Sequence, residues 1–327
     1  MKYTFMAAQV GEFKVKQMCQ MLGVQRSGYY AWRRRKPSTW AQANQKLLEL
    51  IETEHKKSRK TYGSPRLQVI LRRKGIVCGH NRVARLMRLH GIVALTRRRH
   101  RPVTTQRQPG VVPAPNRLNQ DFSASRPNQK WVSDFTYIET VEGWLFLAVV
   151  LDLFSRKVIG WSMSPKMDTA LVETALRMAL LGRRPPAGLL HHSDQGSQYT
   201  SAAYRNCLNA ALAQLSMSGA GNCYDNAVME SFFGTLKTEC VTGSFPNRAL
   251  ARTTIFEYIE VWYNRQRLHS TLGYHSPVDF EQLTLLPCLQ NRGKVTRASK
   301  RRGGGKTFFA VFSPAPFSMG RAGVGVF

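Results

Sequence analysis

The spacing of apolar residues changes character about a third of the way along the chain. Before residue 96, apolar positions recur every three or four residues, which is the spacing of amphipathic helices. From Asn128 onward, alternating and continuous apolar runs predict strands, with helical segments between them. The pattern therefore predicts an all-helical front part followed by a part that combines strands and helices.

The first helical region, residues 10–33, is expected to form two short helices around a turn. Gly23 supplies the turn, and Ser27 is expected to cap the second helix. Four apolar residues of the first helix are expected on one face: Val15, Met18, Met21 and Leu22. The pattern fits a helix-turn-helix and an ordinary helical hairpin equally well.

A second helical region, residues 41–95, predicts a helix-turn-helix more strongly. A helical segment over 41–58 is followed by Ser64 and Pro65, a cap candidate and a favoured first helical residue. Gly75 is expected to end that helix. The next helix has four apolar residues expected on one side: Val83, Leu86, Met87 and Leu89.

Three arginines at a spacing of three, Arg82, Arg85 and Arg88, share the other side of that last helix. A helix that lies along the phosphates of a DNA groove needs such a basic face. A solvated helix face is the alternative. We favour DNA contact because no nearby acid balances these charges.

Charge makes a polyanionic partner the preferred explanation. The chain of 327 residues holds 48 Lys and Arg against 19 Asp and Glu, a formal net charge of +29. There are 17 basic residues and no acid between His55 and Gln120, whereas 15 of the 19 acids lie between Asp121 and Glu281. We expect double-stranded DNA rather than an anionic membrane surface as the partner, with a DNA-gripping front half and an enzymatic second half.

Residues 96–126 have the composition of a basic linker rich in Arg, Pro and Thr. Such an extended segment can follow a DNA backbone, and Arg97, Arg98 and Arg99 are expected to contact it. The most apolar run, 144–153, is too short to cross a bilayer, and the six cysteines lack metal-ligand or disulfide-framework spacing. We expect a cytoplasmic, nucleoid-associated protein that does not enter membranes.

The second part of the chain predicts the element order β-β-β-α-β-α-β-α. This order is typical of α/β folds with a mixed sheet flanked by helices, as in ribonuclease-H-like nucleases. Three carboxylates stand where they could converge: Asp134 inside the first strand, Asp194 just past the fourth, and Glu230 in the following helix. Taken singly, Asp194 could be a turn residue and Glu230 a surface residue. An Asp inside an apolar strand, by contrast, is costly to bury without a partner.

Three such carboxylates would repel one another and raise one another's pKa unless a cation lay between them. Hard oxygen ligands with open positions suit Mg²⁺, or Mn²⁺ in its place. Two such ions about 4 Å apart can activate a water or 3′-hydroxyl and stabilise the leaving oxygen of a phosphodiester. The arrangement therefore predicts two-metal phosphoryl transfer on DNA.

Three other acids near this site are expected to have structural roles. Asp152 stands at a hairpin end, where Asp serves turns. Asp225 lies near the start of the helix that carries Glu230, where an acid caps the helix and favours its dipole. Glu239 follows Glu230 by nine residues and is expected on the opposite helix face.

The spacing Asp134-x59-Asp194-x35-Glu230, with Lys237 seven residues after the glutamate, resembles the DDE motif of retroviral integrases and related transposases. The surrounding words are similar to those of the orfB subunit of insertion-sequence family three transposases over residues 1–282. The words that carry this resemblance are MCQMLGVQRSGYYAW, YGSPRLQVILRRKGI, PNQKWVSDFTYIET, GWLFLAVVLDLFSRKVIGWSMS, HHSDQGSQYTS, SMSGAGNCYDNAVMESFFGTLKTEC and YIEVWYNRQRLHSTLGYHSPVDFE.

The resemblance implies a ribonuclease-H-like integrase core in which Asp134, Asp194 and Glu230 are the catalytic residues and metal ligands. Lys237 would share the face of Glu230 and meet the DNA end. Asn222, Tyr224, Asp225 and Asn226 belong to a family word that would position this helix. The resemblance also implies a homo-oligomer on DNA and an upstream-frame orfA partner, or a fusion to it.

Two departures from the family pattern stand out. Residues 219–221 read Gly-Ala-Gly where the family commonly has a basic residue, and the tail from about residue 288 matches no family word. We expect that tail to be disordered. The resulting division of the chain is a helical segment 1–40, a helix-turn-helix-like domain 41–95, a linker 96–126, an integrase core 127–287 and a tail 288–327.

Three functions remain open from the sequence. The first is a transposase that cuts element ends and joins the 3′-hydroxyl to target DNA. The second is a metal-dependent nuclease of the same fold. The third, from a different class, is an inactive DNA-binding remnant or regulator of transposition, which the unusual tail keeps open although all three acidic positions are intact.

Overall fold

The computed structural model describes residues 1–284 except for 97–113, 220–222 and 242. The linker arginines Arg97, Arg98 and Arg99 and the tail from 288 therefore lie outside the described residues. One unit of the structure comprises Met1–Glu281. In the part of the chain that is described, no helix is both long and apolar enough to cross a membrane.

The first three helices form a small cluster around Met6, Met18, Cys19 and Tyr29. They are α1 (Lys2–Ala8), α2 (Val15–Leu22) and α3 (Arg26–Arg34). Gly23 ends α2 in a left-handed conformation, with φ of 61°, as its position between two helices predicted.

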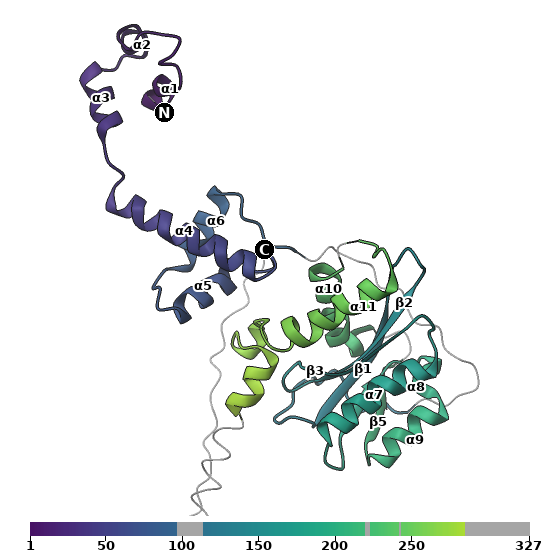
Figure 1. The fold of residues 1–327 in the computed structure, drawn as a ribbon. Helices are drawn as coiled ribbons and strands as arrows, with labels where there is room; N and C mark the ends of the chain where they lie inside the picture. The colour runs from purple at the N-terminus through teal and green to yellow at the C-terminus, as the bar shows by residue number, and fades with distance from the viewer. Residues whose placement is uncertain (97–113, 220–222, 242, 285–327) are drawn as a thin grey trace, which may run out of the picture. The chain divides into compact units, whose positions relative to one another are not determined.

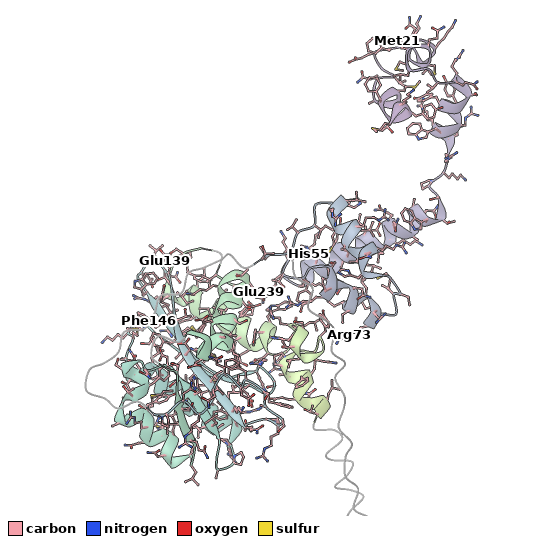
Figure 2. All side chains as sticks on the ribbon, turned by 180° about the vertical axis from the view of Figure 1, so that it is seen from behind. Met21, His55, Arg73, Glu139, Phe146 and Glu239 are labelled. Atoms are coloured by element: carbon pink, nitrogen blue, oxygen red, sulfur yellow. The ribbon has the colours of Figure 1, made fainter. Side chains whose placement is uncertain are left out.

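Two predictions for this cluster are wrong. Met21, labelled in Figure 2, is 88% exposed, because α2 turns Met18 and Cys19 rather than Met21 toward the cluster core. Ser27 does not cap α3. The helix begins one residue earlier, at Arg26, with Gln25 as its N-cap.

The next three helices, α4 (Thr39–Lys57), α5 (Ser64–Arg73) and α6 (His80–Leu89), pack around an apolar core. Its buried residues include Leu47, Ile51, Leu67, Leu71, Val83, Leu86 and Met87. The predicted helices are confirmed here, but two details differ. Ser64 is the first helical residue and Gly63 the N-cap, so the Ser64 hydroxyl is left to lie 2.9 Å from His80 Nε2. Leu89 is 67% exposed, because it ends α6 beyond the packed turns.

The remaining described elements form a five-stranded mixed sheet with helices on both faces (Figure 1). The sheet order is β3-β2-β1-β4-β5, with antiparallel pairing among β1, β2 and β3 and parallel pairing of β4 with both β1 and β5. The strands are β1 (Lys130–Ile138), β2 (Leu145–Asp152), β3 (Val158–Ser164), β4 (Leu190–Ser193) and β5 (Gln214–Met217). The predicted order of strands and helices is confirmed.

Alternate residues of the central strands face two different helical layers, as the two-residue period of a strand requires. One layer is α10, α11 and the π-helical continuation η2, which pack with Val132 and Val149. The other is α7 and α9, which pack with Trp131 and Val150. The α-helices are α7 (Thr169–Arg183), α8 (Ser197–Thr200), α9 (Ala202–Ala210), α10 (Ala227–Glu239) and α11 (Arg248–Phe256). The 3-10 helices are η1 (Cys223–Asn226) and η3 (Ser270–Leu272), and the π-helix is η2 (Glu257–Tyr263).

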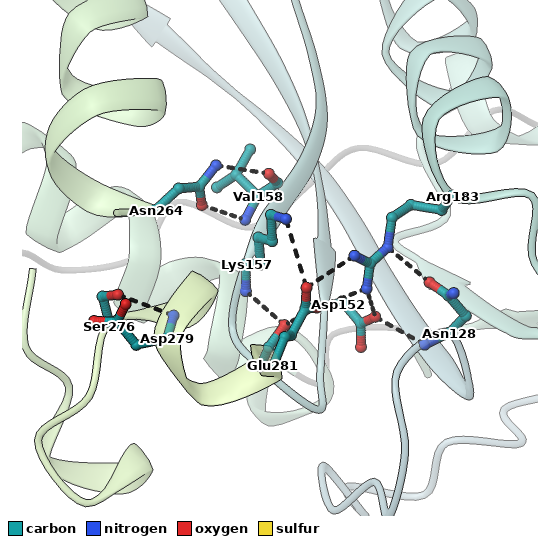
Figure 3. A network of polar contacts seen from close by, with 10 residues as sticks. Asn128, Asp152, Lys157, Val158, Arg183, Asn264, Ser276, Asp279 and Glu281 are labelled. Carbon is teal, nitrogen blue, oxygen red and sulfur yellow. Dashed lines mark hydrogen bonds and ion pairs between the residues drawn. The ribbon is translucent and has the colours of Figure 1, made fainter. Parts of the chain in front are cut away.

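A buried polar network connects the end of β2, the end of α7 and Glu281 (Figure 3). Asp152, at the end of β2, is fully buried and accepts hydrogen bonds from the backbone amides of Asn128 and Phe154. The Arg183 guanidinium lies between Asp152 and Glu281, at 3.1 and 2.6 Å. The predicted turn role of Asp152 is therefore confirmed, and the ion pairs offset the cost of burying its charge.

Candidate active site

Asp134 lies in the middle of β1, on the sheet face that α10 covers. It shares that face with the alternate residue Val132, which packs in the same core as the buried residues of α10. Its Oδ1 accepts the Phe135 amide at 2.8 Å, and its Oδ2 accepts the side-chain amide of Asn226 at 2.8 Å. Both hydrogen bonds fix the orientation of the carboxylate.

Asp194 follows directly after β4, the parallel neighbour of β1. The strand register pairs Lys130 with Leu190 and Val132 with His192, so its continuation brings Asp194 level with Asp134. The Asp194 Oδ1 accepts the Gly196 amide at 3.0 Å, which forms the tight turn that the sequence allowed for. Asp194 therefore both forms this turn and lies at the end of the strand next to β1.

Glu230 lies in the first turn of α10. This helix is held against the sheet by four buried apolar side chains: Met229, Phe232, Phe233 and Leu236. Glu230 itself is only partly buried. Helix packing therefore carries Glu230 to the sheet face on which Asp134 lies.

The charges of Asp194 and Glu230 both act on the Asp134 carboxylate. Loss of solvation raises the pKa of Asp134 well above its usual range, the Asp194 charge raises it further, and Glu230 contributes a smaller increase. Tyr199, fully buried nearby, has a pKa raised by burial and then by Asp134. A positive charge placed among the carboxylates would reverse this repulsion.

The oxygen donors of this site suit a hard divalent cation. Among the residues that the structure describes, no three His, Cys, Asp or Glu side chains are gathered closely enough to hold one ion together. Asp194 and Glu230 both raise the pKa of Asp134, so the two carboxylates lie within electrostatic reach of Asp134.

Comparisons with known proteins identify the domains and the family of the chain. Residues 42–100 match the HTH-like domain family, and residues 124–223 and 230–285 match two families described as integrase core domain. The chain is 46% identical over 288 residues to the transposase InsF of insertion sequence IS3A from Escherichia coli K12, covering 87% of this chain and all of that protein. The chain belongs to the IS3 family of transposases.

Two other similarities extend the comparison. An uncharacterized 31 kDa protein of insertion element IS600 from Shigella sonnei is 46% identical over 266 residues, 81% of this chain and 97% of that protein. The HTLV-2 integrase catalytic core in complex with magnesium is 16% identical, covers 49% of this chain and 99% of its own, and has a TM-score of 0.38.

The transposase has two further residues that organise the start of α10. Asn226 is the N-cap residue of this helix, and its side chain reaches Asp134. Asp225 is buried and accepts hydrogen bonds from the Asn116 side chain and the Gly219 amide, both at 2.9 Å. The prediction that Asp225 caps the helix is wrong, because its carboxylate points back to the preceding loop and to the end of the linker.

The sequence signal for Asn226 was the family word around Glu230, which indicated only that the word positions the helix. The contact with Asp134 depends on β1 and α10 being brought together and has no local pattern. Its Oδ1 is buried and has no hydrogen-bond partner among the described residues. Asn226 is therefore the residue of this site whose individual contact sequence reasoning did not identify.

Glu239 has a purely structural environment. Its carboxylate forms a buried ion pair with Arg267 at 2.8 Å and accepts hydrogen bonds from Tyr258 and Trp262. Lys237, on the same helix, lies with its Nζ 4.4 Å from the centre of the Tyr137 ring. Burial lowers the pKa of Lys237.

The three arginines of α6 do not form the uniform basic face that the sequence predicted. Arg82 donates a hydrogen bond to Asn44 at 2.8 Å and is partly buried. The Arg85 guanidinium lies 4.8 Å from the ring of Trp40. Arg88 is exposed, and no side-chain partner is found for it among the described residues. The packing of α4 against α6 accounts for the difference, because it brings Asn44 and Trp40 beside two of the three side chains.

Proposed function

We propose that the transposase cuts the ends of its element and joins the 3′-hydroxyl to target DNA by two-metal phosphoryl transfer. The observation that carries this proposal is the position of Asp134 within β1 and of Asp194 directly after β4, the parallel neighbour of β1. Glu230 lies on the helix that covers the same face. The raised pKa of Asp134 supports a site that is completed by a cation.

Asp134, Asp194 and Glu230 would hold two Mg²⁺ or Mn²⁺ ions. Bound ions would supply charge stabilisation to the attacking and leaving oxygens of the phosphodiester. The residues of the chain prepare the site for this. Asn226 and the Phe135 amide orient the Asp134 carboxylate, and the turn at Gly196 orients that of Asp194.

Double-stranded DNA, as element ends and as target, is the proposed partner. Lys237 would meet the DNA end beside Glu230, and Arg88 with the linker arginines Arg97, Arg98 and Arg99 would contact phosphates. Arg82 and Arg85 keep a proposed DNA role that is secondary to their contacts within α4 and α6. We also propose a homo-oligomer on DNA and an orfA partner or fusion.

We propose a separate function for each segment expected from the sequence. The helical segment 1–40 and the domain 41–95 would bind DNA, and the linker 96–126 would follow its backbone. The core 127–287 would carry the chemistry.

The test replaces each proposed metal ligand and measures two reactions on DNA that carries the inverted repeats flanking the gene. Asp134→Asn, Asp194→Asn and Glu230→Gln should each abolish Mg²⁺-dependent cleavage and joining while retaining folding and DNA binding. Glu173→Gln is the matched control, since Glu173 lies on α7 and pairs with the exposed Arg177. Thermal melting checks the fold of every variant.

Three outcomes separate the alternatives. Cleavage without joining would indicate a nuclease, and DNA binding without either reaction would indicate a regulator. Full activity in Glu230→Gln would show that this residue is not a metal ligand. Equal loss of activity in Glu173→Gln would show that the assay reports general damage rather than the site.

A further inference from the structure

A pair of exposed aromatic side chains lies on the first hairpin of the core. Tyr137, in β1, and Trp144, just before β2, have ring centres 5.0 Å apart and planes at 78°. They remain 47% and 48% exposed. Other aromatic pairs of the core, such as Phe232 with Tyr263, are buried.

Two cationic side chains adjoin this pair. Lys237 Nζ lies over the Tyr137 ring at 4.4 Å, and Arg248 Nε donates to the Trp144 carbonyl at 3.2 Å. The nearby acid Glu142 accepts the backbone amide of Arg248 at 3.0 Å. We call Tyr137, Trp144, Lys237 and Arg248 the aromatic platform. Proteins bind unpaired nucleic acid with aromatic rings that stack on the bases and cationic side chains that contact the phosphates.

The platform is built on the same two elements as the carboxylates. Tyr137 follows Asp134 by three residues along β1, about 10 Å at strand rise. Lys237 follows Glu230 by seven residues along α10, again about 10 Å at helix rise. Because three is an odd step, Tyr137 points to the sheet face opposite Asp134, and the long Lys237 side chain of α10 still reaches its ring. About three stacked nucleotides at 3.4 Å each span that length.

A hairpin needs no such exposed pair for its own stability. The hairpin is already paired over eight residue pairs, from Trp131 with Asp152 to Ile138 with Leu145, and its inward residues are buried. A cross-strand aromatic pair contributes only about 0.2–1 kcal/mol relative to alanines. The cations beside the rings and the position along β1 and α10 are features that hairpin stability does not require.

We propose that the aromatic platform binds an unstacked nucleobase of the DNA strand held at the carboxylates, about three nucleotides from the reacting phosphate. Trp144 and Tyr137 stack on the base, and Lys237 and Arg248 contact the adjoining phosphates. The proposal rests on the proposed function in taking DNA as the ligand. It adds a base-binding site that holds the strand end open.

The experiment compares two DNA duplexes of about 30 base pairs and identical sequence, one blunt and one ending in about three unpaired nucleotides at the 3′ end. Binding of the full chain is measured by fluorescence anisotropy in EDTA, so that the result does not depend on metal or on cleavage. The wild type should prefer the unpaired end by about fivefold to a hundredfold, the range expected for one stacked base. Trp144→Ala should remove that preference and keep affinity for the blunt duplex, and Trp144→Phe should keep most of it.

Phe256→Ala is the matched control. Phe256 is 49% exposed and forms an edge-to-face pair with Trp161, whose indole donates to the acid Glu260 rather than adjoining cations. This variant should retain the preference for the unpaired end. An unchanged preference in Trp144→Ala, or equal loss in Phe256→Ala, would overturn the proposal.

A second measurement uses only the wild-type chain and therefore does not depend on variant folding. 2-Aminopurine is placed as the third nucleotide from the 3′ end. Stacking on the platform should change its fluorescence on binding more in the unpaired end than in the blunt duplex. Equal binding of both duplexes, with equal fluorescence, refutes the platform. The cleavage assay on the carboxylate variants tests the proposed function, and binding in EDTA tests the platform. Either proposal can therefore be refuted without the other.

Discussion

The side-chain amide of Asn226 donates a hydrogen bond to Oδ2 of Asp134 at 2.8 Å. This contact joins the N-cap residue of α10 to the central strand of the sheet. It holds one carboxylate oxygen in place while the other accepts the Phe135 amide. Groups that orient metal-binding carboxylates in this way are commonly as important as the ligands themselves.

Replacing Asn226 with alanine should therefore weaken metal binding rather than abolish the reaction. We expect the Mn²⁺ concentration for half-maximal cleavage to rise by roughly 10- to 100-fold in Asn226→Ala, with the maximal rate less affected. Mn²⁺ binding to the free protein, followed by electron paramagnetic resonance, should weaken in parallel. Asn209→Ala, at an exposed position of α9, is the control. An unchanged Mn²⁺ dependence would limit Asn226 to holding the start of α10 against β1.

The buried ion pair between Arg267 and Glu239 predicts a large loss of stability when one partner is removed. Arg267→Met leaves the Glu239 carboxylate buried with only the Tyr258 and Trp262 donors. We expect the free energy of unfolding to fall by about 3–5 kcal/mol, since an uncompensated buried charge is costly. Urea denaturation followed by circular dichroism measures the change.

Arg177→Met provides the comparison for that variant. Arg177 forms a surface pair with Glu173 one helical turn away, and its side chain is 63% exposed. Exposed pairs of this kind contribute about 0.5 kcal/mol or less. Similar losses in both variants would mean that the buried pair has no special role.

Because of the buried histidines His191 and His192, we expect the free energy of unfolding to fall in mild acid. Burial lowers the pKa of His191 to about 3 and of His192 to about 4, so both rings stay neutral in the folded protein. Unfolded histidines take up protons below about pH 6.5, which favours the unfolded state. Their contribution to stability is thus complete above pH 6.5 and is lost progressively as the pH falls toward 4 and 3.

At pH 5 each histidine should cost about 2 kcal/mol relative to pH 7. His192→Asn, which can preserve the 2.8 Å contact with Ser216, should show a smaller drop than the wild type between these pH values. Urea unfolding at both pH values is the measurement, and His90→Gln at the exposed end of α6 is the control. The same drop in wild type and His192→Asn would contradict the assignment.

The arginines of α6 should separate into structural and DNA-contacting residues. Arg88→Ala should leave the melting temperature unchanged. It should reduce the slope of log binding constant against log salt concentration by about one, the value of one phosphate contact. Arg82→Ala should instead lower the melting temperature, because it removes the hydrogen bond to Asn44. Binding titrations at several salt concentrations, with thermal melts, distinguish the two. A salt slope that Arg88→Ala leaves unaltered would remove Arg88 from the proposed DNA surface.

The sequence by itself determined the order of elements and the candidate chemistry of this protein. Alternation of apolar residues in 130–138 predicted β1, and an acid in that run marked Asp134 as exceptional because burying it unpaired is costly. The position of Asp194 at the end of β4 also followed from local pattern. These features are readable because strand and helix periods are set by the backbone over a few residues.

Only the tertiary structure decided which side chains meet. Asn226 reaches Asp134 across 92 residues of chain, and Asp225 turns away from its helix to bind Asn116. Likewise, Arg82 donates a hydrogen bond to Asn44 and Met21 is exposed. Helical spacing had predicted a DNA-facing Arg82 and a Met21 that packs with Met18. The physical reason is that periodicity specifies a face of an element, whereas contacts depend on what the packing of other elements places against that face.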